Sequence, residues 1–149
     1  MTPHPPNPIP LLRTRLDLLR TLRKLSAEQL DLIRQEKIDD ADCVVDVKQA
    51  VVLRLESWQR NNAHLLEDWD GIETGLDPVA LQTCRDLRLA TDRELSQLHI
   101  SEAESRIHLQ RQWDRVGTEL SSLARGAETL SAYENSTSSP SQLTFDVNQ

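Results

Sequence analysis

A chain of 149 residues is long enough for one domain. Hydrophobic residues make up 38% of it and aromatic residues only 3%, which favours Leu-rich helix packing over a compact α/β core. The formal net charge of −7 argues against nucleic acid as a partner, because such binding depends on cationic contacts with phosphate.

The first ten residues, "MTPHPPNPIP", hold five of the seven prolines and predict a disordered lead over 1–10. They lack the charged and apolar regions of a secretory signal. The chain also has no run of about 18 apolar residues, so we expect no membrane span. We therefore expect a cytoplasmic location.

The segment 11–36 is predicted to form the first helix, because its apolar residues recur every three or four positions. They are Leu12, Leu16, Leu19, Leu22, Leu25, Leu30 and Ile33. The acidic stretch "EKIDDAD" then breaks the pattern and predicts a new helix start, with Asp39, Asp40 or Asp42 as the N-cap residue. These acids do not follow the spacing of a calcium-binding EF-hand loop, so we expect no metal site.

A second helix is predicted over 41–69, with one polar member, Asn62, in its apolar stripe. The apolar members are Val44, Val47, Val51, Leu55, Trp58, Leu65 and Trp69. The stripe predicts a hairpin with the first helix. Lys48 is expected to flank it with a buried stem and an amine in water.

A third helix is predicted to begin at Asp77-Pro78, with Asp as N-cap and Pro in the first helical position. An approximate heptad rhythm of apolar residues continues to Leu130, although Glu102 and Ser105 interrupt it. From Ser131 the chain becomes Ser-rich, which predicts a flexible tail over 131–149. The expected organisation is therefore one helical domain over 11–130 between two flexible termini.

The predicted third helix is much longer than the second, ~80 Å against ~45 Å at about 1.5 Å per residue. If it packs antiparallel on the hairpin, 109–130 extends past the hairpin's end. This segment either bends back at Gly117 as a fourth helix, oligomerises or receives a partner. We predict a partner-binding surface there, formed by Leu109, Trp113, Val116, Leu120 and Leu123.

The sequence contains none of the residue spacings that are typical of catalytic or metal sites. The four histidines and two cysteines have no HExxH or CxxC spacing, and no glycine-rich phosphate loop or GxSxG occurs. We therefore expect no catalytic residue, cofactor or metal, and no enzymatic activity. One alternative is an all-helical chorismate mutase of the AroQ type, which would require Arg15, Lys37, Arg93 and Glu94 to converge.

The stretch 22–55, "LRKLSAEQLDLIRQEKIDDADCVVDVKQAVVLRL", resembles the FlgN-type flagellar export chaperones. In that family a Leu-rich first helix with a mid-helix Gln leads through an acidic turn to a second helix with a Lys. Gln29, the acids of 39–42 and Lys48 occupy the matching places, and Tyr133 stands before a polar tail. The resemblance covers about residues 11–135.

The resemblance implies an all-α fold, an antiparallel helical hairpin plus a long third helix in a three-helix coiled-coil-like bundle. It implies a cytoplasmic chaperone that binds the C-terminal amphipathic helix of secreted hook-associated proteins, with the export apparatus as a further partner. The alternative is a structural coiled-coil adaptor that uses the same stripe to associate with itself.

Overall fold

The computed structural model describes the backbone of residues 7–147 and the side chains of residues 7–136. Within that range all regular structure is helical, which confirms the all-α class. The chain forms two compact units, Met1–His108 (unit 1) and Leu109–Gln149 (unit 2). The predicted disorder of 1–6 and the last two residues of the predicted tail lie outside the described residues.

Helix α1 spans Pro8–Arg34 and begins before the predicted start at Leu11. The side chain of Asn7 accepts a hydrogen bond of 3.1 Å from the Ile9 N–H. Pro8, in the first turn, has no backbone N–H and so needs no acceptor. All but one of the predicted apolar positions are buried; Leu25 is only partly buried.

The turn after α1 is a Schellman motif. The N–H of Lys37 bonds to the carbonyl of Leu32 at 2.9 Å, and the N–H of Glu36 bonds to the carbonyl of Ile33 at 3.0 Å. Glu36 occupies the left-handed position, with φ of 61°, which glycine usually fills because it has no Cβ. The motif reverses the chain within a few residues and brings the next helix back along α1.

Helix α2 spans Ile38–Asn61, and its N-cap residue is Lys37, which makes no side-chain capping bond. The prediction of Asp39, Asp40 or Asp42 as N-cap is therefore wrong. Asp39 and Asp40 lie in the first turn instead, where their charges favour the positive end of the helix dipole.

The predicted second helix over 41–69 is divided in the structure, because α2 ends at Asn61. The Asn62 side chain donates a bond of 2.8 Å to the Trp58 carbonyl, which competes with the helical ladder. Two short helices follow, α3 over Ala63–Glu67 and α4 over Trp69–Thr74. Val44, Val51, Trp58 and Leu65 are buried as predicted, whereas Val47 is 52% exposed.

Helix α5 spans Pro78–Val147. Its start is as predicted, since Oδ1 of Asp77 accepts a bond of 2.8 Å from the Ala80 N–H. The helix continues through Gly117, so the alternative of a fourth helix that bends back there is wrong. It also continues past Leu130, where the sequence predicts the helix to end and a tail to begin.

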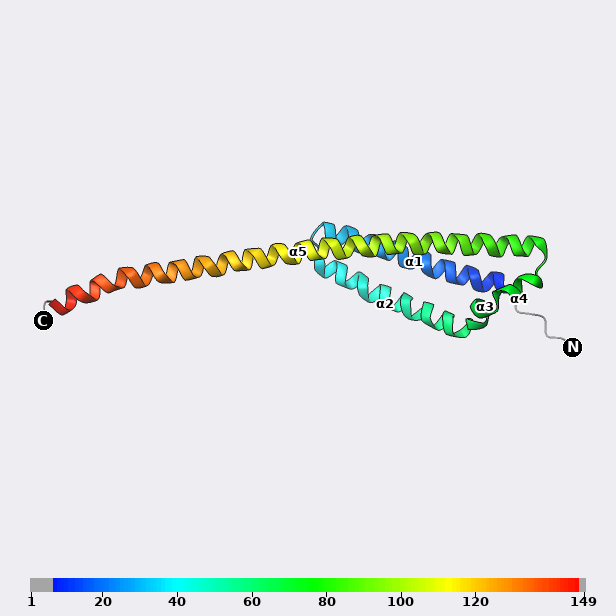
Figure 1. Cartoon of the computed structure of the whole chain (residues 1–149), viewed down its shortest axis with the longest axis horizontal. Coiled ribbons are helices and arrows are strands. Elements are labelled where there is room, and N and C mark those ends of the chain that lie inside the picture. Colours follow the sequence, from blue (N-terminus) through cyan, green and yellow to red (C-terminus); the bar gives the residue numbers. More distant parts are fainter. Residues whose placement is uncertain (1–6, 148–149) are drawn as a thin grey trace. The chain divides into compact units, whose positions relative to one another are not determined.

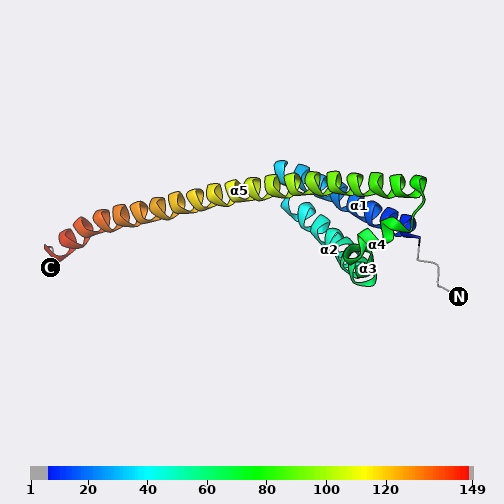
Figure 2. The same ribbon diagram turned by 45° about the vertical axis from the view of Figure 1, so that its right-hand side comes forward.

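In unit 1, α1, α2 and the first part of α5 lie side by side in both views (Figures 1 and 2). The backbones of α1 and α2 pack closely, whereas that of α5 approaches them at few points. Cys84 and Thr91 of α5 are buried in this unit.

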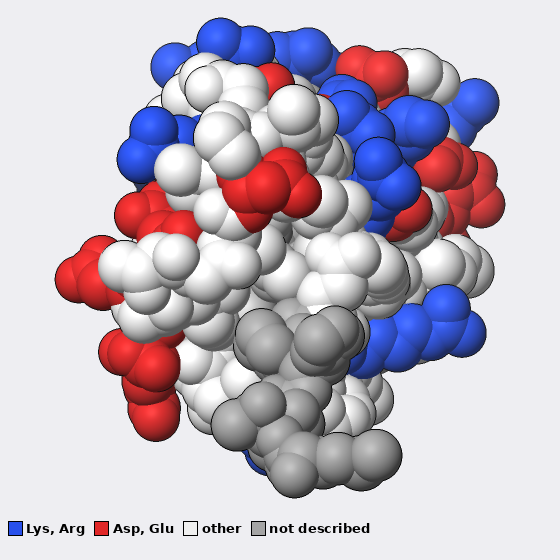
Figure 3. All heavy atoms as spheres, turned by 90° about the vertical axis from the view of Figure 1, so that its right-hand side faces the viewer, with Lys and Arg blue, Asp and Glu red and all other residues white. Residues whose placement is uncertain are grey.

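Figure 3 looks onto the end of unit 1 that carries α3 and α4. Acidic and basic side chains both appear on this face, with uncharged surface between them.

Polar side chains connect α5 to both α1 and α2. The Ser26 hydroxyl of α1 donates to Oε1 of Glu102 at 2.7 Å, and the Lys48 amine of α2 contacts the same oxygen. Lys48 also donates to Oε1 of Gln29 at 2.7 Å. We call Ser26, Gln29, Lys48 and Glu102 the polar layer. The expectation that the Lys48 amine lies in water is wrong, because that side chain is only 13% exposed and bonded within the layer.

Candidate functional site

The five predicted partner-binding residues lie in α5 within unit 2. Trp113 is 72% exposed, Val116 46%, Leu120 61% and Leu123 70%. Leu109 is partly exposed. The side chains thus present apolar surface to solvent.

Their spacing places them on one face of the helix. From Leu109 to Trp113, Val116, Leu120 and Leu123 the steps are four, three, four and three residues. A repeat that averages 3.5 residues is the seam of a left-handed coiled coil, in which each side chain inserts between four of a facing helix. Leu130, 65% exposed, lies seven residues after Leu123 and continues the seam.

The positions beside this seam are mostly small or uncharged. A Cβ added at Gly117 or Gly126 would meet nothing within 4 Å, so the surface is open at both. Glycine there lets a facing backbone approach closely. The flanking residues, in chain order, are Gln110, Gln112, Gly117, Glu119, Ala124 and Gly126. This surface suits an apolar helix face better than a charged ligand.

The chorismate mutase constellation is not brought together. Arg15 lies in the second turn of α1 and Lys37 beyond the end of that helix, which separates them by roughly 30 Å along its axis. Glu94 forms ion pairs with Arg20, at 3.8 Å, and with Arg23. These pairs hold α5 to α1.

No group of three or more His, Cys, Asp or Glu side chains in the described part of the chain could hold a metal ion. Of the two cysteines, Cys84 is buried and Cys43 is exposed. Burial, with the nearby charge of Glu73, raises the pKa of the Cys84 thiol, which lowers its thiolate fraction and its reactivity.

The polar layer is the feature that sequence reasoning missed. Burial alone would raise the pKa of Glu102. Hydrogen bonds from Lys48 and Ser26, together with the charges of Lys48 and Arg106, outweigh burial and lower the pKa. The available signal was Glu102 itself, an acid that interrupts the apolar rhythm. Its partners are 54 and 76 residues away in the chain, so no local pattern pairs them.

The chain was compared with models of known protein families, with curated proteins and with solved structures, and none of these matches it. None of the described helices combines the length and the apolar content needed to cross a lipid bilayer. The functional interpretation therefore depends on the surface of unit 2 and the polar groups of unit 1.

Proposed function

We propose that the chain is a cytoplasmic type III (flagellar) export chaperone. It would bind the C-terminal amphipathic helix of a hook-associated protein before secretion. The observation that supports this is the exposed seam of unit 2, in which Trp113, Leu120 and Leu123 are each more than half exposed. Extended exposed apolar surfaces of this kind mark interaction sites.

In this proposal the client's apolar face packs along the seam, as amphipathic helices do when they dock on a complementary apolar surface. The hairpin and the long third helix act together as a three-helix coiled-coil-like bundle that carries this surface. The function of the chain in this proposal is binding rather than catalysis, and the export apparatus receives the client afterwards.

The second candidate is a structural adaptor in which two copies of the seam associate. The regular alternation of four- and three-residue steps favours it, because a seam with that repeat can pair with its own copy. The two functions use the same surface and differ in the occupant.

Binding calorimetry with synthetic C-terminal helices of hook-associated proteins tests the chaperone proposal on the full chain. Trp113→Asp and Leu120→Asp should each weaken binding by about 100-fold or more, because a carboxylate buried in an apolar seam costs about 3 kcal/mol. Thr118→Asp is the matched control. It adds the same charge at an exposed position on the opposite side of the helix, and binding should be unchanged.

Sedimentation equilibrium separates the two candidates. A monomer that binds the helical peptides supports the chaperone. A dimer or tetramer that dissociates on Trp113→Asp and binds no peptide supports the adaptor. A monomer that binds none of the peptides contradicts both.

A further inference from the structure

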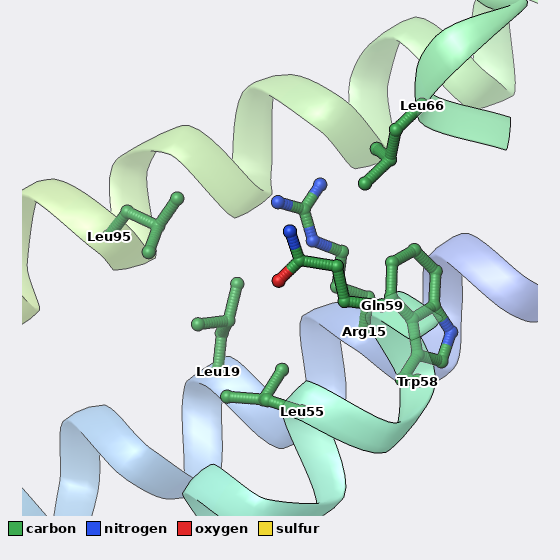
Figure 4. Close-up of a pocket in the computed structure, with 7 residues that line it drawn as sticks. All are labelled: Arg15, Leu19, Leu55, Trp58, Gln59, Leu66 and Leu95. Carbon is green, nitrogen blue, oxygen red and sulfur yellow. The ribbon is translucent and has the colours of Figure 1, made fainter. Parts of the chain in front are cut away.

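Unit 1 has a hollow of about 180 Å³ away from the seam. Residues of α1, α2, α3 and α5 line it, so it exists only when these helices have come together. Its apolar wall consists of Trp58 and four leucines, Leu19, Leu55, Leu66 and Leu95. Arg15 and Gln59 complete the lining. Figure 4 shows the Arg15 guanidinium and the Gln59 carboxamide among these apolar side chains.

Arg15 is held in place on one side. Its guanidinium carbon lies 5.4 Å from the centre of the Trp58 ring, within the range of a cation–π contact. The ring itself is fixed, because its Nε1–H donates a bond of 3.0 Å to the Leu11 carbonyl. The cation therefore has a defined position at the hollow.

No hydrogen bond or ion pair engages the Arg15 guanidinium within the described part of the chain. Three other arginines of α1, by contrast, each pair with an acid of α5. Burial lowers the pKa of Arg15, Asp92 opposes that effect without forming an ion pair, and Arg88 adds to it. The nitrogens of this half-buried guanidinium still reach solvent, since no fully buried polar side-chain atom among the described residues lacks a partner. Their donors are thus open to a ligand, and a carboxylate engages a guanidinium best through two parallel hydrogen bonds.

The size of the hollow restricts what can accompany that carboxylate. A dry cavity of about 150 Å³ holds one benzene molecule, whereas whole-metabolite pockets are typically about 300–1,000 Å³. One short aliphatic or aromatic group fits here, with its charged end toward Arg15.

We propose that this hollow binds a carboxylate that carries a single side-chain-sized apolar group. The carboxylate pairs with the Arg15 guanidinium, and the apolar group contacts the leucines and the Trp58 ring. Two sources share this chemistry, a free aryl or alkyl carboxylic acid and the C-terminal carboxylate of a polypeptide that ends in an apolar residue. The site is independent of the seam and of the function proposed for it.

Amide chemical shifts of the full chain, titrated with 3-phenylpropionate, test the site. We expect saturable shifts at the lining residues with a Kd on the order of 1 mM, as befits a ligand of this size. The neutral 3-phenylpropanamide should bind at least tenfold more weakly. A parallel titration with a short peptide ending in Phe, as the free acid and as the C-terminal amide, distinguishes the two sources. Saturable binding of either free acid supports the proposal.

Two variants and a control decide whether Arg15 carries the binding. Arg15→Gln should weaken it at least tenfold, whereas Arg13→Gln, at an exposed position of the same helix, should leave it unchanged. Gln59→Glu places a carboxylate beside Arg15, so it should weaken ligand binding without lowering the melting temperature. Equal binding of acid and amide, full binding by Arg15→Gln, or no saturable shift with either acid would overturn the proposal.

Discussion

The Ser26 hydroxyl donates a hydrogen bond of 2.7 Å to Oε1 of Glu102, a residue 76 positions further along the chain. Because the Lys48 amine reaches the same oxygen, one carboxylate connects α1, α2 and α5. The helices of unit 1 are therefore positioned by a specific polar group as well as by apolar packing.

Lys48→Met should destabilise unit 1. It leaves Gln29 and Glu102 without their shared donor. Because the Glu102 side chain is about one-third exposed, water screens this charge-assisted bond, and its loss should cost about 1–2 kcal/mol of unfolding free energy. Lys24→Met is the matched control at an exposed position of α1, where the change should stay within about 0.5 kcal/mol. Urea unfolding followed by circular dichroism measures both. Equal losses in the two variants would show that the bonds of Lys48 contribute nothing to stability.

The stability that Glu102 supplies should depend on pH. Its pKa is lower in the folded protein than the ordinary value of 4.5, so the folded state binds the proton less readily than the unfolded state. The contribution is complete above that ordinary value and is lost as the pH falls through the folded-state pKa. The gap in unfolding free energy between wild type and Glu102→Gln should therefore be widest at neutral pH and narrow in acid. A gap that stays constant down to low pH contradicts this assignment.

The same substitution should destabilise the protein at Val51 and leave its stability almost unchanged at Trp113. Val51 is 6% exposed in unit 1, and Val51→Asp should cost about 3 kcal/mol or more through burial of a charge. Trp113 is 72% exposed. Trp113→Asp should therefore change the free energy of unfolding of unit 1, measured by thermal melting, by less than about 0.5 kcal/mol. If Trp113→Asp unfolds the protein as severely as Val51→Asp does, the seam is core and the proposed partner surface is wrong.

Glu36 offers a test of the turn between α1 and α2. Glu36→Gly removes the Cβ penalty at φ of 61°, and it should leave the protein about 1 kcal/mol more stable than Glu36→Ala. Both variants lose the carboxylate, so their difference isolates the backbone effect. Chemical denaturation of the two variants measures this difference. Equal stability of the alanine and glycine variants would show that a Cβ at position 36 causes no backbone strain.

Sequence reasoning succeeded where the signal was local. Asp77 and Pro78 define the start of α5, because an N-cap and a first-turn proline act within one turn. The buried leucines of α1 followed from the periodicity of its apolar residues. The same reasoning failed at Asn62, whose side chain bonds to the backbone carbonyl of Trp58 and ends α2.

The remaining failures have a shared cause in tertiary contacts. Lys48 was expected to reach water, but its acceptor, Glu102, is 54 residues away and reaches it only after α5 has docked. The Arg15 hollow likewise takes its lining from four helices, and no short stretch of sequence contains it.

The chain separations within the polar layer also set an order of folding. Lys48 and Gln29 are 19 residues apart, whereas Ser26 and Glu102 are 76 apart, two doublings of loop length that add about 1.2 kcal/mol of closure entropy. A ribosome completes α1 and α2 before it adds the first residue of α5. We expect the nascent hairpin to form first, with Lys48 already bonded to Gln29 while Glu102 is still untranslated. Docking of α5 is then a late event in biosynthesis, and the newly made hairpin exposes its α5-facing surface until that moment.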